Sequence, residues 1–547
     1  MQNRKDVIVL DIETNLTHDT IWMCGVKVNY DSSICVTDPQ ILQSMLSTAK
    51  TVIGHNIIGF DLPTLESCWK IDFSGIEVKD TLVMSRLLEP DMDGGHGLKA
   101  WGKRIGVDKM DFDIEDFDGG LTDDMIEYCL RDVDVTHQLY YVLNNKLSEY
   151  SPNSIQLEHD VAAITAQQIK NGFKLDISVA SNWHSEMCNR CEEIEEELQT
   201  IFPPIITARW SEKTGKRLKD SVEVFNVGSR QQIGRRLEGL GVVWKEYTPT
   251  GVPVINEKTL DIPVPEAQLC KEYLQLVKLR GMAESWLTMV NRDTGRLHGY
   301  VNPCGAVTGR MTHSKPNLAQ IPSLPIARKC FTVEMGNVLV GCDASGLELR
   351  CLAHYMNDDG YTQEILHGDI HTANQNAAGL SERNQAKTFI YAFLYGAGDA
   401  KIGSIVGGTA QQGKQLKEKF LRNTPRLRVL RETVARNAGT GYLTGVDGRK
   451  VHVRSEHAAL NTLLQSCGAI VMKEAIRICV SKLKRNGIPF QLVGQIHDEF
   501  QIETPEHFGK AVGMTARQSI IDAGINLNMN CPLDGEYRIG TNWSETH

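Results

Sequence analysis

The pattern of hydrophobic and polar positions divides the 547-residue chain into three stretches. Residues 6–150 alternate short apolar runs with longer amphipathic segments, which is typical of a compact α/β domain. From 155 to about 290, apolar residues recur every three to four positions, which predicts long helices broken at the proline pair 203–204. Since a single core stops growing at about 250–300 residues, we expect three or four domains.

The third stretch mixes strands and helices. Apolar runs near 296–302 and 337–344 predict strands, and residues 345–436 predict helices. In the segment QLVGQIHDEFQIE, residues 491–503, apolar and polar residues alternate on both sides of an acidic turn. This alternation predicts two short strands joined by a tight turn. Adjacent carboxylates between buried strands are costly unless a cation neutralises them.

Two carboxylates of this stretch are expected to share a metal site. Asp343 ends one predicted strand, and Asp498 lies in the acidic turn. If one sheet holds both strands, the carboxylates converge and repel unless they share divalent ions. Oxygen ligands favour Mg²⁺ or Mn²⁺, and two such ions about 4 Å apart commonly catalyse nucleotidyl transfer. The sequence therefore predicts a two-metal centre.

A predicted helix in the segment SERNQAKTFIYAFLYG carries cations and aromatic rings on one face. Arg383, Lys387, Tyr391 and Tyr395 recur every four residues, so each step drifts by only about 40° around the helix. Ser381 is expected to cap its start. Two cations followed by two aromatic residues indicate a phosphate grip and a stacking platform. In isolation, the pattern would also fit an amphipathic surface helix.

The N-terminal stretch offers a second set of acidic ligands. Asp11 and Glu13, two apart on a predicted strand, point to the same side of a sheet. Asp61 follows in the motif GHNIIGFD, and Tyr128 and Asp132 lie one helical turn apart. Alone, the DIET motif would be an ordinary acidic strand edge. With the other two motifs present in order, it indicates a metal cluster.

These motifs resemble those of a known family. DASGLELR, RNQAKTFIYAFLYG and HDE are similar to motifs A, B and C of family A DNA polymerases, especially the replicative enzymes of short-tailed phages of the T-seven type. The similarity extends through NPCGAVTGRMTHSKPNLAQIP and DGRKVHVRSEHAALNTLLQS, nearly the whole C-terminal half. The N-terminal carboxylates resemble the DEDD-type 3′ to 5′ exonuclease of proofreading polymerases.

The resemblance implies an α/β and α+β multidomain fold. An RNase H-like exonuclease domain would precede a right-hand polymerase with palm, fingers and thumb. The implied function is template-directed addition of dNTPs to a primer, with proofreading, in phage-type DNA replication. The implied boundaries are exonuclease 1–150, thumb 151–300 with a short basic tip near 205–225, palm 301–360 and 437–547, and fingers 361–436.

The resemblance also implies roles for residues of the polymerase site. Asp343 and Asp498 would hold both metals, helped by the backbone carbonyl of Ala344. Glu499 and His497 would lie beside them at the primer end. The resemblance also implies that Glu499 and Lys387 are catalytic residues. The implied nucleotide-binding residues are Arg383, Lys387, His371, Tyr391 near the sugar, and Glu348 at the 2′ position. The implied DNA contacts are Arg310 and Gln465 at the terminal base pair, His497 and Tyr395.

In the implied exonuclease, four carboxylates would bind metal and Tyr128 would orient the attacking water. These carboxylates belong to Asp11, Glu13, Asp61 and Asp132. Because every element of this set is present, we expect the exonuclease to be active. The cofactors implied are two Mg²⁺ ions in each of the two sites, for which Mn²⁺ can substitute.

Charge is distributed unevenly along the chain. The net charge of −10 combines −13 in residues 1–150, with 13 Lys+Arg against 26 Asp+Glu, and +3 in residues 151–547, with 45 against 42. Residues 205–247 hold nine Lys+Arg against five acids. This cluster suits contact with DNA phosphates, and it equally fits a solvated surface.

Expected partners are primer-template DNA, dNTPs, and a helicase-primase or processivity factor. Phage relatives that recruit thioredoxin carry a long insertion at the thumb tip, where only IITARWSEKTGKRLKDSVEVF stands here, which argues against thioredoxin. Because the N-terminus runs directly into a strand pattern, no preceding 5′ nuclease domain is expected. With no signal-peptide pattern and no apolar run of about 20 residues, a cytoplasmic protein is expected, in a host bacterium if phage-encoded. Fourteen scattered cysteines indicate neither a disulfide framework nor a zinc site.

Two other functions fit parts of the sequence. A repair or RNA-processing nuclease would need only the N-terminal carboxylates, with a C-terminal half that merely binds nucleic acid. A non-enzymatic clamp on primer-template DNA would need neither site. Asp343, Lys387 and Asp498 argue against both, because a binding module has no need of metal carboxylates and a triphosphate helix.

Overall fold

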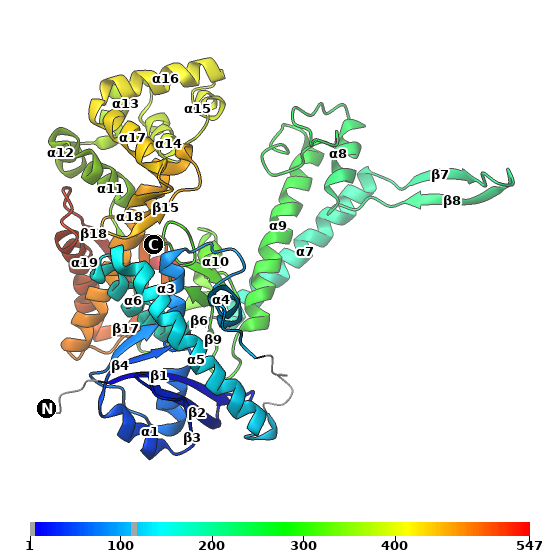
Figure 1. Cartoon of the computed structure of the whole chain (residues 1–547). Coiled ribbons are helices and arrows are strands. Elements are labelled where there is room, and N and C mark those ends of the chain that lie inside the picture. The colour runs from blue at the N-terminus through cyan, green and yellow to red at the C-terminus, as the bar shows by residue number, and fades with distance from the viewer. Residues whose placement is uncertain (1–5, 111–117) are drawn as a thin grey trace. The chain divides into compact units, whose positions relative to one another are not determined.

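A computed structural model describes residues 6–110 and 118–547 of the chain (Figure 1). The chain divides into two compact units. The first contains the residues up to Gly172, together with Gly299–Gln320 and Val333–His547, and the second contains Phe173–His298 and Ile321–Thr332. Helix α6 (Pro152–Asn171) belongs to the first unit and packs on its helix α18 (Ala459–Arg485).

The N-terminal part of the first unit is built on a five-stranded sheet. The order is β3-β2-β1-β4-β5, with β1 antiparallel to β2 and parallel to β4. Ile8, Val9 and Leu10 of β1 are fully buried, in keeping with the apolar VIVL run. The strands are β1 (Asp6–Thr14), β2 (Ile21–Val28), β3 (Ile34–Val36), β4 (Ala49–Gly54) and β5 (Glu77–Asp80).

The longest helix of this part, α5 (Asp123–Lys146), packs on β1 and β2. It begins where the Thr122 side chain accepts a hydrogen bond from the Met125 backbone N–H. Asp123 and Asp124 in the first turn complement the positive end of the helix dipole. The other helices are α1 (Pro39–Leu46), α2 (Asp61–Thr64), the π-helix η1 (Leu65–Trp69), α3 (Thr81–Leu88), α4 (Leu98–Ile105) and the short η3 (Leu147–Glu149).

A second sheet, of four antiparallel strands, organises the C-terminal part of the first unit. Its order is β16-β17-β13-β18. The predicted hairpin at 491–503 is confirmed as β16 and β17. Helix α19 (Gly509–Asn526) packs on this sheet and on α18. The strands are β13 (Asn337–Ala344), β16 (Gln491–Ile496), β17 (Glu499–Pro505) and β18 (Gly535–Gly540).

Seven helices follow β13, as the sequence predicts for residues 345–436. They share one continuous apolar core with α18, α19 and the four-stranded sheet. They are α11 (Leu347–Met356), α12 (Asp359–His367), α13 (Ile370–Ala378), α14 (Arg383–Leu394), α15 (Asp399–Ile405), α16 (Ala410–Asn423) and α17 (Pro425–Ala438). The remaining elements of the unit are β10 (Tyr300–Asn302), β11 (Thr312–Ser314), η4 (Leu318–Gln320), β14 (Tyr442–Thr444), β15 (Lys450–His452), η5 (Glu456–Ala458), η6 (Glu506–Phe508) and η7 (Trp543–Glu545).

The second unit is mostly helical, with α7 (Ile177–Ile201) packed along α9 (Pro265–Met289). A two-stranded ribbon, β7 (Ile205–Trp210) and β8 (Arg217–Glu223), extends from the end of α7 (Figure 1). Periodicity predicted no strand here, and the ribbon leaves Trp210 61% exposed. The other elements are β6 (Phe173–Leu175), α8 (Arg230–Glu238), β9 (Arg296–Leu297), α10 (Pro325–Lys329) and β12 (Phe331–Thr332).

Across residues 6–110 and 118–547, none of the helices combines the length and hydrophobicity that crossing a bilayer requires.

Candidate active sites

The four-stranded sheet brings Asp343 and Asp498 together. Asp343 is near the end of β13, directly opposite Glu499, the first residue of β17. Asp498 lies in the turn just before β17, and its carbonyl accepts a 3.0 Å hydrogen bond from the backbone N–H of Ala344. Two residues 155 positions apart in sequence are therefore neighbours, where β13 ends and β17 begins.

The surroundings of Asp343 favour a bound cation. Burial, followed by the negative charges of Asp498, Glu499 and Glu536, raises the pKa of Asp343 to about 7. Both Asp343 and Asp498 line a cavity of about 520 Å³. A positive ion in this cavity would favour the ionised carboxylates and lower that pKa.

Glu499 is oriented differently from the two aspartates. Its side chain is 4% exposed and does not line the 520 Å³ cavity. Its Oε1 accepts a 2.7 Å hydrogen bond from the Trp543 indole N–H and another from the Gln501 amide. Its Oε2 is 2.5 Å from Nδ1 of His547. The carboxylate is therefore held by residues 501–547 rather than directed at Asp343 and Asp498.

The turn that carries Asp498 has an unusual backbone. His497 adopts a left-handed conformation, with φ of +58°. This geometry reverses the chain between β16 and β17 and leaves the His497 side chain exposed at the cavity. The tight turn predicted between the two strands is therefore confirmed.

Two tyrosines, one on helix α14 and one at its C-cap, face the same cavity. Tyr391 and Tyr395 line it together with Glu348 and Arg310. The Tyr395 hydroxyl donates a hydrogen bond to Glu348, and the Arg310 guanidinium lies 3.7 Å from the same carboxylate. Glu348 is thus held at the cavity wall by two neighbours.

The cations of α14 are placed at its exposed beginning. Arg383 forms two hydrogen bonds with Asp369, at 2.6 and 3.0 Å, and Lys387 is exposed. The His371 ring centre lies 6.4 Å from that of Tyr391, and its buried Nδ1 has no hydrogen-bond partner in the described part of the chain. Arg383 and Lys387 are not among the residues that line the cavity.

Ser381 and Gln465 do not line this cavity. The prediction that Ser381 caps α14 is wrong, because the N-cap position is Glu382 and its side chain makes no capping bond. Gln465, on α18, donates to Asn461 at 3.1 Å. The local preference for Ser at an N-cap favoured Ser381, and only the structure places Glu382 at this position.

The N-terminal sheet gathers the second set of carboxylates. Asp11 and Glu13 project from the central strand β1 to one side, as their spacing predicts. Asp61 begins α2, and its Oδ1 accepts a 3.1 Å hydrogen bond from the Ile12 backbone N–H. Asp132 lies on α5, which packs on β1, and its charge raises the pKa of Asp11 and Glu13.

Crowding and burial shift these carboxylates strongly. Burial raises the pKa of Asp11 well above its ordinary value, and the charges of Asp61, Asp132 and Glu13 raise it further. Burial, then the Asp132 charge, raises the pKa of Glu13 to about 8. Burial raises the pKa of Asp61 to about 7. Such a cluster is stabilised by a divalent cation, which favours the charged forms.

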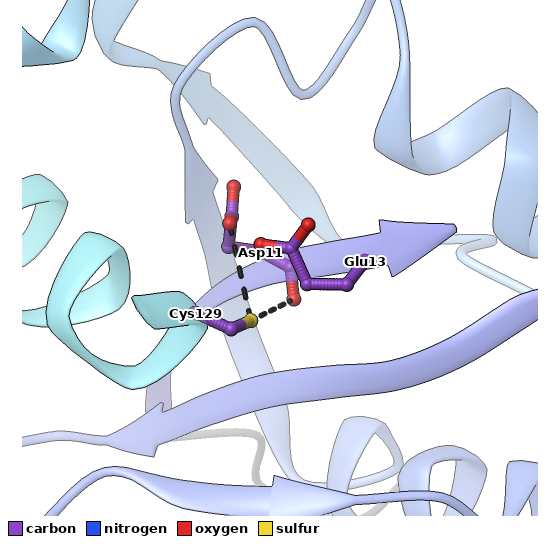
Figure 2. A group of neighbouring side chains, drawn as sticks. All are labelled: Asp11, Glu13 and Cys129. Atoms are coloured by element: carbon purple, nitrogen blue, oxygen red, sulfur yellow. Dashed lines mark hydrogen bonds between the residues drawn. The ribbon is translucent and has the colours of Figure 1, made fainter. Parts of the chain in front are cut away.

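A thiol lies beside these carboxylates. Atoms of Asp11, Glu13 and Cys129 that could bind a metal lie within 4.8 Å of one another (Figure 2). Burial raises the pKa of the Cys129 thiol, so it remains protonated, and Sγ donates to the Asp11 carbonyl at 3.6 Å and to Asp11 Oδ2 at 3.9 Å. A neutral, soft sulfur is a poor ligand for Mg²⁺. Through its two hydrogen bonds, Cys129 instead fixes the position of Asp11.

The donor atoms of the N-terminal site fit a divalent metal. Asp132 is 3% exposed, and its Oδ1 has no hydrogen-bond partner within residues 6–110 and 118–547. A buried carboxylate oxygen without a donor is costly, and a cation satisfies it. The other ligands available are carboxylate oxygens, which suit Mg²⁺ or Mn²⁺.

Sequence reasoning missed several residues at the two sites. Lys109 forms an ion pair with Asp132, and Trp543 and His547 hold Glu499. None belongs to a recognisable motif, and each reaches its partner only through the tertiary fold. The sequence offers no signal that distinguishes Lys109 from the other 12 Lys and Arg residues of positions 1–150.

The sequence profile of DNA polymerase family A matches residues 206–545, and that of a 3′-5′ exonuclease matches residues 24–148. The chain belongs to DNA polymerase family A and carries a 3′-5′ exonuclease domain. The resemblance seen in the motifs is confirmed, as are the mixed α/β fold class and the function of a DNA-directed DNA polymerase. Both domains are of metal-dependent types. Asp11 and Glu13 precede the matched exonuclease residues, so their roles rest on geometry.

Individual relatives agree with this assignment. The chain is 33% identical to the DNA-directed DNA polymerase of Escherichia phage T7, over 99% of this chain and 100% of the relative. The same identity and coverage hold for the DNA-directed DNA polymerase of Enterobacteria phage T3. Among solved structures, the POL domain of Pol1 from M. smegmatis, in complex with DNA primer-template and dNTP, is similar in fold with a TM-score of 0.81. That similarity covers 100% of this chain and 96% of the other at 19% identity.

Proposed function

We propose that this polymerase extends a primer 3′ end by nucleotidyl transfer at the Asp343 and Asp498 pair and hydrolyses mispaired ends at the N-terminal carboxylates. The observation that carries the proposal is the register of β13 and β17, which puts Asp343 opposite Glu499 and next to Asp498. The raised pKa of Asp343 supports it, because converging carboxylates need a cation.

In the polymerase site, Asp343, Asp498 and the Ala344 carbonyl would hold a pair of Mg²⁺ ions, for which Mn²⁺ can substitute. When bound, such a pair stabilises the attacking and leaving oxygens of the transfer. His497, exposed at the cavity, is placed to contact the primer end. The role of Glu499 is to anchor the turn that carries Asp498, since both its oxygens are already hydrogen-bonded.

The incoming dNTP would lie in the cavity beneath α14. Lys387 and Arg383 bind its triphosphate, and a ring nitrogen of His371 donates a further hydrogen bond to the phosphates. Tyr391 stacks near the sugar. Glu348, held by the Tyr395 hydroxyl, crowds the 2′ position and favours deoxyribose. Because Arg383 is paired with Asp369, it must exchange that partner for the triphosphate.

Contacts to DNA complete this assignment. Arg310, at the cavity wall, and Gln465 would touch the terminal base pair, and Tyr395 would support the templating base. The partners are primer-template DNA and dNTPs.

The exonuclease, thumb, palm and fingers have the boundaries expected from the sequence. Residues 173–298 form the compact part of the thumb.

In the exonuclease, two Mg²⁺ ions would be held by Asp11, Glu13, Asp61 and Asp132. Tyr128, one turn before Asp132 on α5, orients the water that attacks the terminal phosphodiester. The Cys129 hydrogen bonds to Asp11 keep that carboxylate in place.

The β7–β8 ribbon, or a separate processivity factor or helicase-primase, would retain the enzyme on DNA. The enzyme would act in the cytoplasm of a host bacterium. The exposed loop between the strands carries Lys213 and Lys216. If the ribbon binds phosphates, each lost contact lowers the salt dependence of DNA binding by about 0.9 in logarithmic slope. Binding of Lys213→Gln with Lys216→Gln at several salt concentrations measures this.

One experiment tests the proposed function. The protein is incubated with primed template, dNTPs and Mg²⁺. Extension with some degradation supports the proposal. Shortening without extension at any dNTP concentration would favour a nuclease with a DNA-binding half, and DNA retention without chemistry would favour a clamp.

A further inference from the structure

Lys109 contacts two residues of the proposed exonuclease site. It lies after α4, outside the elements β1, α2 and α5 that carry the four carboxylates and Tyr128. Its Nζ is 2.5 Å from Oδ2 of Asp132 and 4.6 Å from the centre of the Tyr128 ring, and it also hydrogen-bonds the Tyr128 side chain. One cation therefore joins two residues that lie one turn apart on α5.

The two oxygens of Asp132 have different surroundings. Oδ2 is paired with Lys109, while Oδ1 is buried and has no hydrogen-bond partner among the described residues. The pairing leaves one defined oxygen available, because the ammonium prevents the carboxylate from rotating freely. Without Lys109, neither oxygen of Asp132 would have a hydrogen-bond donor among the described residues.

We propose that Lys109 is a positioning residue of the exonuclease: by holding Oδ2 it directs Oδ1 of Asp132 to the metal and keeps Tyr128 beside it. Hydrogen-bond partners of metal ligands typically contribute about 10–100-fold to metal affinity or activity. This inference rests on the proposed metal site of the exonuclease. It does not require Lys109 to touch the substrate.

A different role for the same ammonium makes the opposite prediction. If Lys109 merely stood in the place of the metal, its removal would relieve competition and tighten metal binding. If it positions Asp132, its removal weakens metal binding. The sign of the change in metal affinity therefore decides between the two roles.

The test measures Mn²⁺ binding by electron paramagnetic resonance at a fixed pH. All proteins carry Asp343→Asn and Asp498→Asn, so that only the N-terminal site binds the ion. We expect Lys109→Met to weaken Mn²⁺ binding by about tenfold, the lower end of the range for partners of metal ligands. Lys109→Arg, which keeps the charge and the donors, should restore most of it.

Lys103→Met is the matched control, because Lys103 is an exposed lysine on the adjacent helix α4. It should bind Mn²⁺ like the parent. Circular dichroism and thermal unfolding verify folding, and Lys109→Gln replaces Lys109→Met if the latter does not fold. Equal or tighter Mn²⁺ binding by the folded Lys109→Met or Lys109→Gln protein would overturn the inference. Absence of Mn²⁺ binding in the parent itself would instead contradict the proposed metal site.

A second readout separates positioning from general destabilisation. Exonuclease hydrolysis by Lys109→Met should require more Mg²⁺ for half-maximal rate, and saturating Mg²⁺ should recover part of the rate. Primer extension, measured without the two aspartate substitutions, should not change. A uniform loss of both activities at every Mg²⁺ concentration would argue against a positioning role.

Discussion

The indole N–H of Trp543 donates a 2.7 Å hydrogen bond to Oε1 of Glu499. Trp543 is 1% exposed and Glu499 4%, so the bond is shielded from water. It links the segment after β18 to the strand that begins directly after Asp498. The position of the Asp498 turn therefore depends on residues 45 positions further along the chain.

Trp543→Phe should lower the free energy of unfolding by about 1.5–3 kcal/mol, because it removes a hydrogen bond to a buried carboxylate. Primer extension should slow, while hydrolysis of the primer should remain near the parent rate. Both are measured on the same preparation, with urea unfolding for stability. Equal loss of the two activities would show that Trp543 acts only on overall stability.

Asp343→Asn or Asp498→Asn should reduce primer extension more than about 100-fold, since loss of a direct metal ligand exceeds the effect of an outer partner. Primer degradation should persist. Asp11→Ala combined with Glu13→Ala should do the reverse. The two-site assignment would be wrong if either folded variant lost both activities.

Lys387→Ala should raise the dNTP concentration required for half-maximal extension by about 10–100-fold, the range for a lost hydrogen bond to a charged group. Its affinity for primer-template DNA should change little, because the charge meets the triphosphate rather than the duplex. Lys414→Ala, at another exposed lysine, on α16, serves as control. A larger effect on DNA affinity than on dNTP use would contradict this assignment.

The exonuclease carboxylates predict how stability depends on pH. Glu13 has a pKa of about 8 and Asp61 of about 7 in the folded chain, against ordinary values of about 4. A carboxyl with a raised pKa contributes stability that is fully present below its ordinary pKa and is lost as the pH rises through the folded value. The metal-free protein should therefore lose thermal stability between about pH 4 and pH 8.

Mg²⁺ should reverse this loss, because the ion binds the deprotonated carboxylates. The increase in Tm caused by Mg²⁺ should be larger near about pH 8.5 than near about pH 6, where bound protons compete with the metal. Glu13→Gln should flatten the pH dependence in EDTA. Differential scanning calorimetry measures both effects, and a Mg²⁺ effect independent of pH would contradict the raised pKa values.

Much of both sites could be predicted from local sequence. Strand alternation placed Asp11 with Glu13, and the hairpin pattern placed Asp498 in a turn. Helical spacing placed Tyr391 with Tyr395 on one face. These relations depend on backbone geometry repeated over a few residues, which the order of side chains expresses directly.

The sequence by itself determined the family to which the chain belongs and the elements on which the candidate site residues lie. Only the tertiary structure decided that Lys109 pairs with Asp132, that Trp543 and His547 hold Glu499, and that Arg383 is paired with Asp369 in the free chain. The physical reason is that these contacts join separate segments. Their formation depends on how whole elements pack, and no local periodicity encodes that packing.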